Sequence, residues 1–265
     1  MKVAIIGAGN MGGALARGLA KGSLIPTSNI YVSNPSTPKL EALKAEFPEI
    51  NTTIDNRIAV AAADIIIIAV KPWKVVEVLD ELKPHLDYSR QAVASMVGGL
   101  GIAQLSEWLN KGDGMLPATY IIIPNTAIAT MSSMTFISSA RSTAEREALL
   151  LDIFNELGKA MLIEESAMPA ATSLASCGIA YALRYIRAAM EGGVELGIRA
   201  DEAKHIVMQT LRGAADLLES NNTHPEAEID RVTTPGGLTI KGLNAMEAAG
   251  FTHSVIEGLR ASTKR

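Results

Sequence analysis

The stretch VAIIGAGNMGG, residues 3–13, constrains the fold more than any other part of the sequence. An apolar run leads into Gly7, Gly9 and Gly12, and this G-x-G-x-x-G spacing opens a helix that we expect over Met11–Lys21. The first glycine makes a tight turn, the second lets a pyrophosphate approach the backbone, and the third lets helix and strand pack closely. Phosphates would lie at the helix N-terminus, where unpaired N–H groups and the helix dipole favour an anion. The stretch therefore predicts a dinucleotide-binding unit.

The first 163 residues alternate short apolar runs with helical patterns. Further strands are expected at residues 30–33, 64–70, 91–97, 118–123, 134–138 and 160–164, and a helix at 37–47. The continuous apolar run Asp64–Val70 is typical of a parallel strand covered on both faces. Alternating strands and helices predict an α/β fold with a doubly wound parallel sheet of the Rossmann type.

The pattern changes at Glu164, where we place a boundary between a dinucleotide-binding domain (1–163) and a helical domain (164–265). Helices are expected at Pro169–Gly197, Ala200–Ser220 and Gly237–Ala249, with a turn at residues 220–228. The stretch Ser166–Leu183 has no charged residue, but its many small side chains favour a buried helix over a membrane span. Such a surface predicts close packing against another helix or a partner subunit, and hence a dimer.

Charge and cysteine content exclude several classes of protein. The formal net charge is -4, which gives no basic surface for nucleic acid, so we expect none as a partner, and no membrane either. The single cysteine, Cys177, cannot form an internal disulfide, and the four scattered histidines give no metal-ligand spacing. The start of the chain carries the glycine stretch and no signal-peptide pattern. We therefore expect a cytoplasmic protein with no metal site.

The residues after the second predicted strand bear on which dinucleotide binds. A site for NAD usually places Asp or Glu there, on the ribose 2′-hydroxyl. This chain has Ser33, Asn34 and Pro35 at that point, no acid, and Lys39 shortly after. This combination favours NADP, with NADPH preferred and NADH left open. The alternative is that these are ordinary turn residues.

Four further stretches complete a recognisable pattern. They are AVKP at Ala69–Pro72, PNT at Pro124–Thr126, CGIAYAL at Cys177–Leu183 and VTTPGGLTIKGLNAME at Val232–Glu247. With the glycine stretch, they make the chain resemble the pyrroline-5-carboxylate reductase family over nearly its whole length. The resemblance implies reduction of the cyclic imine L-1-pyrroline-5-carboxylate to L-proline with NAD(P)H, the last step of proline biosynthesis. It also implies a homodimer through the helical domain, leaves a higher oligomer of dimers open, and places the active site between the cofactor domain and the partner's helical domain.

The resemblance also implies roles for individual residues. The loop Pro235–Thr239 would hold the substrate carboxylate with backbone N–H groups and a hydroxyl, although a plain Pro-Gly turn is the alternative. The substrate-binding set is Pro235, Gly236, Gly237, Leu238 and Thr239. Thr239 is the only hydroxyl nominated as a proton donor, and a bound water is the other source. The cofactor-binding set is Ile6, Gly7, Ala8, Gly9, Asn10, Met11, Gly12, Ser33, Asn34, Pro35, Asn56, Ala69, Val70, Lys71, Pro72 and Val97.

The chain departs from the family pattern at three positions. Ile179 and Ala127 replace family prolines, and Arg231 stands where many members have a neutral amide. These departures put the range of imines in question. A reductase of another cyclic imine is therefore one alternative, a β-hydroxyacid dehydrogenase a second, and a non-catalytic NADP-binding regulator a third. The second requires a lysine early in the helical domain, and Ser166–Leu183 has none.

Overall fold

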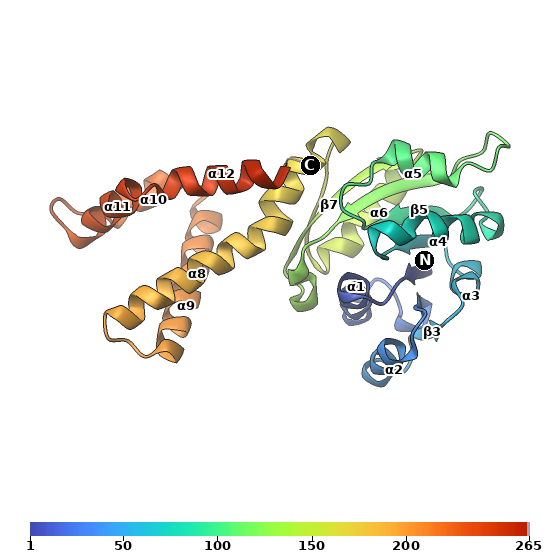
Figure 1. Ribbon diagram of the computed structural model, residues 1–265, viewed down its shortest axis with the longest axis horizontal. Coiled ribbons are helices and arrows are strands. Elements are labelled where there is room, and N and C mark those ends of the chain that lie inside the picture. Colours follow the sequence, from blue (N-terminus) through green and yellow to red (C-terminus); the bar gives the residue numbers. More distant parts are fainter. Residues whose placement is uncertain (264–265) are drawn as a thin grey trace. The chain divides into compact units, whose positions relative to one another are not determined.

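The computed structural model describes residues 1–263, which divide into two compact units between Ser176 and Cys177 (Figure 1). The first unit extends beyond Glu164, where the sequence pattern changes. It includes the short helices η5 (Glu165–Ala167) and α7 (Met168–Ala171) and most of a π-helical segment, Thr172–Cys177. The reason is packing, because Met168 is 8% exposed and lies in the same hydrophobic cluster as the sheet residue Phe136.

The first unit is built on one sheet of eight strands in the order β3-β2-β1-β4-β5-β6-β7-β8. All neighbouring strands are parallel except β6 and β7. The predicted doubly wound sheet is confirmed, while the antiparallel pair and the short polar strand β3 were not predicted. The strands are β1 (Val3–Ile6), β2 (Ile30–Ser33), β3 (Asn51–Thr53), β4 (Ile65–Ile68), β5 (Ala92–Ser95), β6 (Ala118–Ile123), β7 (Ser133–Ala140) and β8 (Gly158–Leu162).

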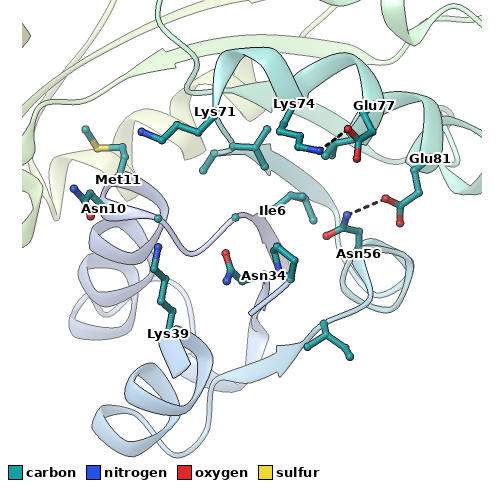
Figure 2. Close-up of a pocket in the computed structure, with 17 residues that line it drawn as sticks. Ile6, Asn10, Met11, Asn34, Lys39, Asn56, Lys71, Lys74, Glu77 and Glu81 are labelled. Atoms are coloured by element: carbon teal, nitrogen blue, oxygen red, sulfur yellow. Dashed lines mark hydrogen bonds and ion pairs between the residues drawn. The ribbon is translucent and has the colours of Figure 1, made fainter. Parts of the chain in front are cut away.

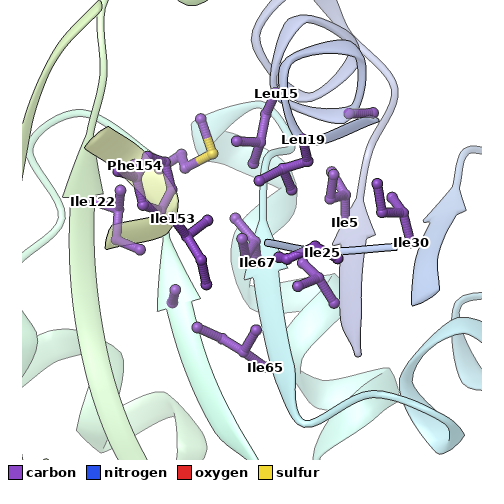
Figure 3. Packing of buried hydrophobic residues seen from close by; sticks show 14 of the residues in the cluster. Ile5, Leu15, Leu19, Ile25, Ile30, Ile65, Ile67, Ile122, Ile153 and Phe154 are labelled. Carbon is purple, nitrogen blue, oxygen red and sulfur yellow. The ribbon is translucent and has the colours of Figure 1, made fainter. Parts of the chain in front are cut away.

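Helices cover both faces of this sheet (Figure 1). One face packs against α1 (Asn10–Lys21), α2 (Thr37–Glu46) and α6 (Ala144–Asn155), and part of this core is drawn in Figure 3. The other packs against α3 (Asn56–Ala61), α4 (Val75–Leu82) and α5 (Ile102–Leu109). Besides η5, the 3₁₀ segments of this unit are η1 (Thr27–Asn29), η2 (Pro72–Lys74), η3 (Lys83–His85) and η4 (Thr126–Thr130).

The apolar run in β4 shows why the sequence specifies a two-sided sheet. Ile65 and Ile67 point into the core on the α1 side, while Ile66 and Ile68 point into the core on the α4 side. All four are at most 3% exposed. Because side chains alternate along a strand, a strand buried on both faces must be apolar at every position. Burying each isoleucine stabilises the fold by roughly 1.5–3 kcal/mol.

The second unit is helical, with α8 (Gly178–Glu195), α9 (Ala200–Asn221), α10 (Pro225–Arg231), α11 (Leu238–Ala248) and α12 (Phe251–Thr263). The predicted helix Pro169–Gly197 is divided, because the π-helical segment interrupts it before α8. The turn predicted at residues 220–228 is partly wrong, since α10 begins there. His224 caps it by accepting the Glu226 N–H, and Pro225 occupies its first position.

The helical unit has almost no core of its own. From Cys177 to Thr263, Ala203 is the one residue that is buried within a single chain. Large apolar side chains are exposed instead, among them Leu183 at 59% and Leu196 at 84%. Within residues 1–263, the structure contains no helix with the length and apolarity needed to cross a membrane.

Candidate functional site

A cavity of about 690 Å³ lies in the first unit where the sheet changes winding direction (Figure 2). β1 lies between β2 and β4, and the carboxyl ends of these strands are locked by two backbone hydrogen bonds. The Gly7 N–H donates to Ser33 O at 2.8 Å, and the Ala69 N–H donates to Ile6 O at 2.9 Å. Crevices at such a reversal are where open α/β sheets bind ligands.

The three glycines of the loop meet different requirements. Gly7 has a φ of +106°, and a Cβ there would lie 2.8 Å from the carbonyl oxygen of Ala69. A Cβ on Gly12 would collide with the Gly7 carbonyl oxygen, so this glycine allows α1 to lie against β1. Gly9 faces open space and precedes α1 without a side-chain cap. The first-turn N–H groups of α1 are therefore available to an anion.

Asn34 braces this loop. Its Oδ1 accepts the Ala8 N–H at 3.0 Å, and its Nδ2 donates to Ser36 O at 3.0 Å and to Ser36 Oγ at 2.9 Å. The residue is 8% exposed. The amide thus ties the glycine loop to the start of α2 while its edge still lines the cavity.

A second polar chain runs along the cavity wall from the end of β2. Ser33 Oγ donates to Asn56 Oδ1 at 2.5 Å. Asn56 Nδ2 donates to Glu81 Oε2 at 3.1 Å, and this second bond is drawn in Figure 2. Ser33 is fully buried, whereas Glu81 is exposed at the rim. Three elements, β2, α3 and α4, are joined at this point.

The cavity also collects charge. Lys74 and Glu77 form an ion pair at 2.7 Å. Lys39 and Lys71 line the cavity without an ion pair to any residue in the described range 1–263. These two free ammonium groups give the cavity a positive potential suited to phosphates.

The structure brings together most of the predicted cofactor residues. Those that line the cavity are Ile6, Gly7, Gly9, Asn10, Met11, Asn34, Pro35, Asn56, Ala69, Val70 and Lys71. Five predicted residues do not line it: Ala8, Gly12, Ser33, Pro72 and Val97. Three of these support the cavity indirectly, Ala8 through its N–H to Asn34, Ser33 through its bond to Asn56, and Gly12 through its close packing on Gly7. Sequence reasoning missed Ile54, Lys74, Glu77, Val78 and Glu81. Glu77, Val78 and Glu81 lie on α4, which has the pattern of an ordinary amphipathic helix, and Ile54 and Lys74 belong to no motif.

The loop before α11 is a second candidate site, in the helical unit. The Gly237 N–H donates to Thr234 O at 2.9 Å, with Pro235 and Gly236 as the central residues. Gly236 has a φ of +70°, which makes this a type II turn with glycine at its required position. α11 then begins at Leu238 without a side-chain cap. Thr239 is exposed, and its hydroxyl has no hydrogen bond within residues 1–263. The arrangement offers free N–H groups and one free hydroxyl.

Several other side chains of a chemically useful kind lie outside these two sites. Glu165 accepts the Ile102 N–H at 2.6 Å and so caps α5. The four histidines are exposed, and Cys177 is half-buried. No cluster of metal-ligating side chains occurs within residues 1–263.

Two hydrogen bonds join the stretch Pro124–Thr126 to the π-helical segment Thr172–Cys177 within the first unit. Asn125 Oδ1 accepts the Ala127 N–H at 3.0 Å, and its Nδ2 donates to Ala175 O at 3.4 Å. Ser176 Oγ donates to Pro124 O at 3.2 Å. The π-helical segment is therefore fixed to the loop after β6.

Comparisons with known proteins place these features in context. Residues 165–265 match the family described as pyrroline-5-carboxylate reductase dimerisation, and residues 2–99 match the family described as NADP oxidoreductase coenzyme F420-dependent. Pyrroline-5-carboxylate reductase 1 of Dictyostelium discoideum is 38% identical over 99% of this chain, which spans 49% of that relative. Pyrroline-5-carboxylate reductase 2 of the same organism is 37% identical over 99% of this chain and 91% of its own length. The crystal structure of Plasmodium falciparum pyrroline carboxylate reductase with NADP bound has a TM-score of 0.88 at 28% identity, covering 99% of this chain and 95% of that one.

Proposed function

Because the chain belongs to the pyrroline-5-carboxylate reductase family, we propose that it reduces L-1-pyrroline-5-carboxylate to L-proline with a nicotinamide cofactor. It is an NAD(P)H-dependent oxidoreductase acting on a C=N bond. Family membership removes the support for a β-hydroxyacid dehydrogenase and for a non-catalytic regulator. The observation that carries the proposal is that one chain contains both the glycine-loop cavity and the uncapped Pro-Gly-Gly turn, and that its relatives are named pyrroline-5-carboxylate reductases.

The residues of the cavity fit a nicotinamide dinucleotide. The open space at Gly9 and the uncapped N-terminus of α1 suit a pyrophosphate, and Lys39 and Lys71 add positive charge. When bound, the reduced nicotinamide supplies a hydride. NADPH is preferred in this proposal because β2 ends without an acid and Lys39 lies on the cavity wall.

The loop Pro235–Thr239 is proposed to bind the substrate carboxylate. The free N–H groups at the start of α11 and the Thr239 hydroxyl are donors of the kind that a carboxylate accepts. A protonated cyclic imine is already electrophilic, so the task of the protein is mainly to position it. The nitrogen proton comes from Thr239 or from a bound water.

Assembly is part of the proposal. The dimerisation-family match and the coreless helical unit both support a homodimer through that unit.

A steady-state assay tests the function. Oxidation of NADPH and of NADH is followed with and without pyrroline-5-carboxylate, and then with other cyclic imines. We expect turnover that depends on the imine, faster with NADPH than with NADH, and greatest with the five-membered carboxylated ring. Absence of imine-dependent turnover with either cofactor, in folded protein, would contradict the proposal.

A further inference from the structure

Glu81 is the one carboxylate on the cavity wall that no cation neutralises within residues 1–263. The other wall carboxylate, Glu77, is paired with Lys74 at 2.7 Å. Glu81 is near enough to Arg57 to help raise the pKa of that guanidinium, but Arg57 is paired with Asp55 at 2.7 Å and not with Glu81. An unpaired negative charge is unexpected in a cavity whose other free charges, Lys39 and Lys71, are positive.

The hydrogen bond between Glu81 and Asn56 indicates what the Glu81 carboxylate does. Its Oε2 accepts a hydrogen bond from Asn56 Nδ2 at 3.1 Å (Figure 2). A carboxylate only accepts hydrogen bonds, so the NH₂ group of Asn56 has to face Glu81 and Oδ1 has to face Ser33. The Ser33 hydroxyl must then be the donor to Oδ1. Glu81 thereby selects one of the two orientations of the Asn56 amide, and the second amide N–H remains as a donor for a ligand.

The position of this pair on the fold indicates which part of a dinucleotide it meets. Phosphates belong at the N-terminus of α1, and the adenosine ribose of a dinucleotide lies by the end of the second strand. Ser33 is the last residue of β2, and it bonds directly to Asn56. Asn56 and Glu81 are therefore on the side of the cavity where the 2′-oxygen of the ribose distinguishes NADPH from NADH.

We propose that Glu81 is a positioning residue that holds the Asn56 amide in the orientation that meets the adenosine ribose. Its negative charge also lowers the preference for NADPH over NADH. The proposal rests on the proposed use of a nicotinamide dinucleotide. The 2′-phosphate of NADPH is an anion, and the Glu81 charge repels it, whereas a neutral 2′-hydroxyl is not repelled. Lys39 attracts the same phosphate. The balance of the two side chains sets how strongly the site discriminates.

The test measures binding and needs no turnover. NADPH, NADH, 2′,5′-ADP and 5′-AMP are titrated calorimetrically into the full chain, as wild type and as the variants Glu81→Gln, Glu81→Ala, Asn56→Ala and the double variant Glu81→Ala/Asn56→Ala. Asp80→Asn is the matched control, because it removes a charge from the same helix at an exposed position that pairs with Lys83 and does not line the cavity. Glu81 is itself exposed, so the two changes made at Glu81 alone leave the core intact.

Glu81→Gln keeps an acceptor for Asn56 but removes the charge. We expect the preference for NADPH over NADH, and for 2′,5′-ADP over 5′-AMP, to rise about threefold at low salt and to rise less at high salt. Glu81→Ala also releases the amide, and we expect NADH to bind about three- to tenfold more weakly. The double variant should bind NADH no more weakly than Asn56→Ala alone, since both changes remove the same interaction.

Two results would overturn the inference. One is a preference for NADPH over NADH that does not rise in Glu81→Gln, or that rises by the same factor in the control Asp80→Asn. The other is additivity of Glu81→Ala and Asn56→Ala for NADH. A chain that binds both cofactors with these responses but does not reduce the imine would instead contradict the proposed function and leave the role of Glu81 standing.

Discussion

Gly236 and Gly237 are neighbours of the same type, yet the turn before α11 needs them for different reasons. Gly236 has a φ of +70°, a conformation that costs other residues about 1–2 kcal/mol. Gly237 has an ordinary φ of -70°, but a Cβ there would lie 2.5 Å from the Thr234 hydroxyl oxygen. A valine at Gly237 therefore fails by collision with Thr234 and not through a disfavoured φ.

The first prediction concerns the free hydroxyl of this turn. Thr239→Val keeps the shape of the side chain and removes its one donor. If the hydroxyl bonds the substrate carboxylate, we expect a loss of about 1–3 kcal/mol, or roughly 5- to 150-fold in kcat/KM for the imine. Steady-state kinetics would measure it, together with NADPH affinity, which should not change. Thr252→Val is the control, because that hydroxyl bonds Glu247 in the same unit outside the turn. Full activity in Thr239→Val would remove the threonine from the site.

The second prediction concerns Asn34. Asn34→Asp preserves the acceptor for the Ala8 N–H, and the Ser36 hydroxyl can donate to the other oxygen. The new charge lies beside the cavity and repels a 2′-phosphate more than a hydroxyl. We expect the ratio of kcat/KM for NADPH to that for NADH to fall, by about tenfold. A lowered activity with both cofactors and an unchanged ratio would show that Asn34 only braces the glycine loop.

At the scale of elements, prediction from sequence succeeded where burial dictates composition. β4 is apolar at every position because both its faces are covered, and the glycine spacing of the loop follows from close approaches at Gly7 and Gly12. β3 was missed because Asn51–Thr53 is a short polar strand at the sheet edge. α10 was missed because its start signals, His224 and Pro225, lie inside a stretch rich in turn residues.

The candidate site divides in the same way. Residues within the loop, such as Gly9, were found because one local motif contains them. Glu81 was not found, because only the packing of α4 beside α3 brings it to Asn56, which is 25 residues away in sequence. A contact between two elements leaves no pattern in the residues around either partner, so a single sequence cannot reveal it.

The third prediction concerns the link between the end of α1 and the end of α6. Glu156 accepts hydrogen bonds from the Ser23 hydroxyl and from the N–H groups of Ser23 and Leu24. Burial raises the pKa of the Glu156 carboxyl, but these hydrogen bonds outweigh it and leave the pKa below its ordinary value of 4.5. We expect Glu156→Gln to destabilise the protein by about 1 kcal/mol at neutral pH.

The pH dependence follows from the sign of that shift. A carboxyl whose pKa is lower in the folded state contributes stability above its unfolded pKa and loses that contribution as pH falls through the folded pKa. The difference in urea midpoint between wild type and Glu156→Gln should therefore be largest above about pH 4.5 and shrink below it. The measurement is made at fixed protein concentration. A difference independent of pH would mean that the charge of Glu156 plays no part.

At the scale of the whole molecule, the fourth prediction is a dimer that holds at micromolar concentration by light scattering. The helical unit exposes an apolar cavity of about 740 Å³ that includes Leu217 on α9, 49% exposed in the single chain. Leu217→Glu should shift the protein toward monomer and lower its Tm, because a charge would be buried on association. Gln209→Glu, on the same helix but outside the cavity, is the control. A Leu217→Glu protein that remains dimeric would show that this surface lies outside the interface.

Between Cys177 and Thr263, Ala203 alone is buried within a single chain, and this also has a genetic consequence. In a two-fold dimer each position on the shared surface occurs twice, so one codon change introduces two altered side chains into a single interface. A cell that carries one normal and one altered copy of the gene would form mixed dimers with a single defect, intermediate in stability between the two pure forms. Two different defective alleles that are complementary in shape could restore each other across the axis, which neither could do alone.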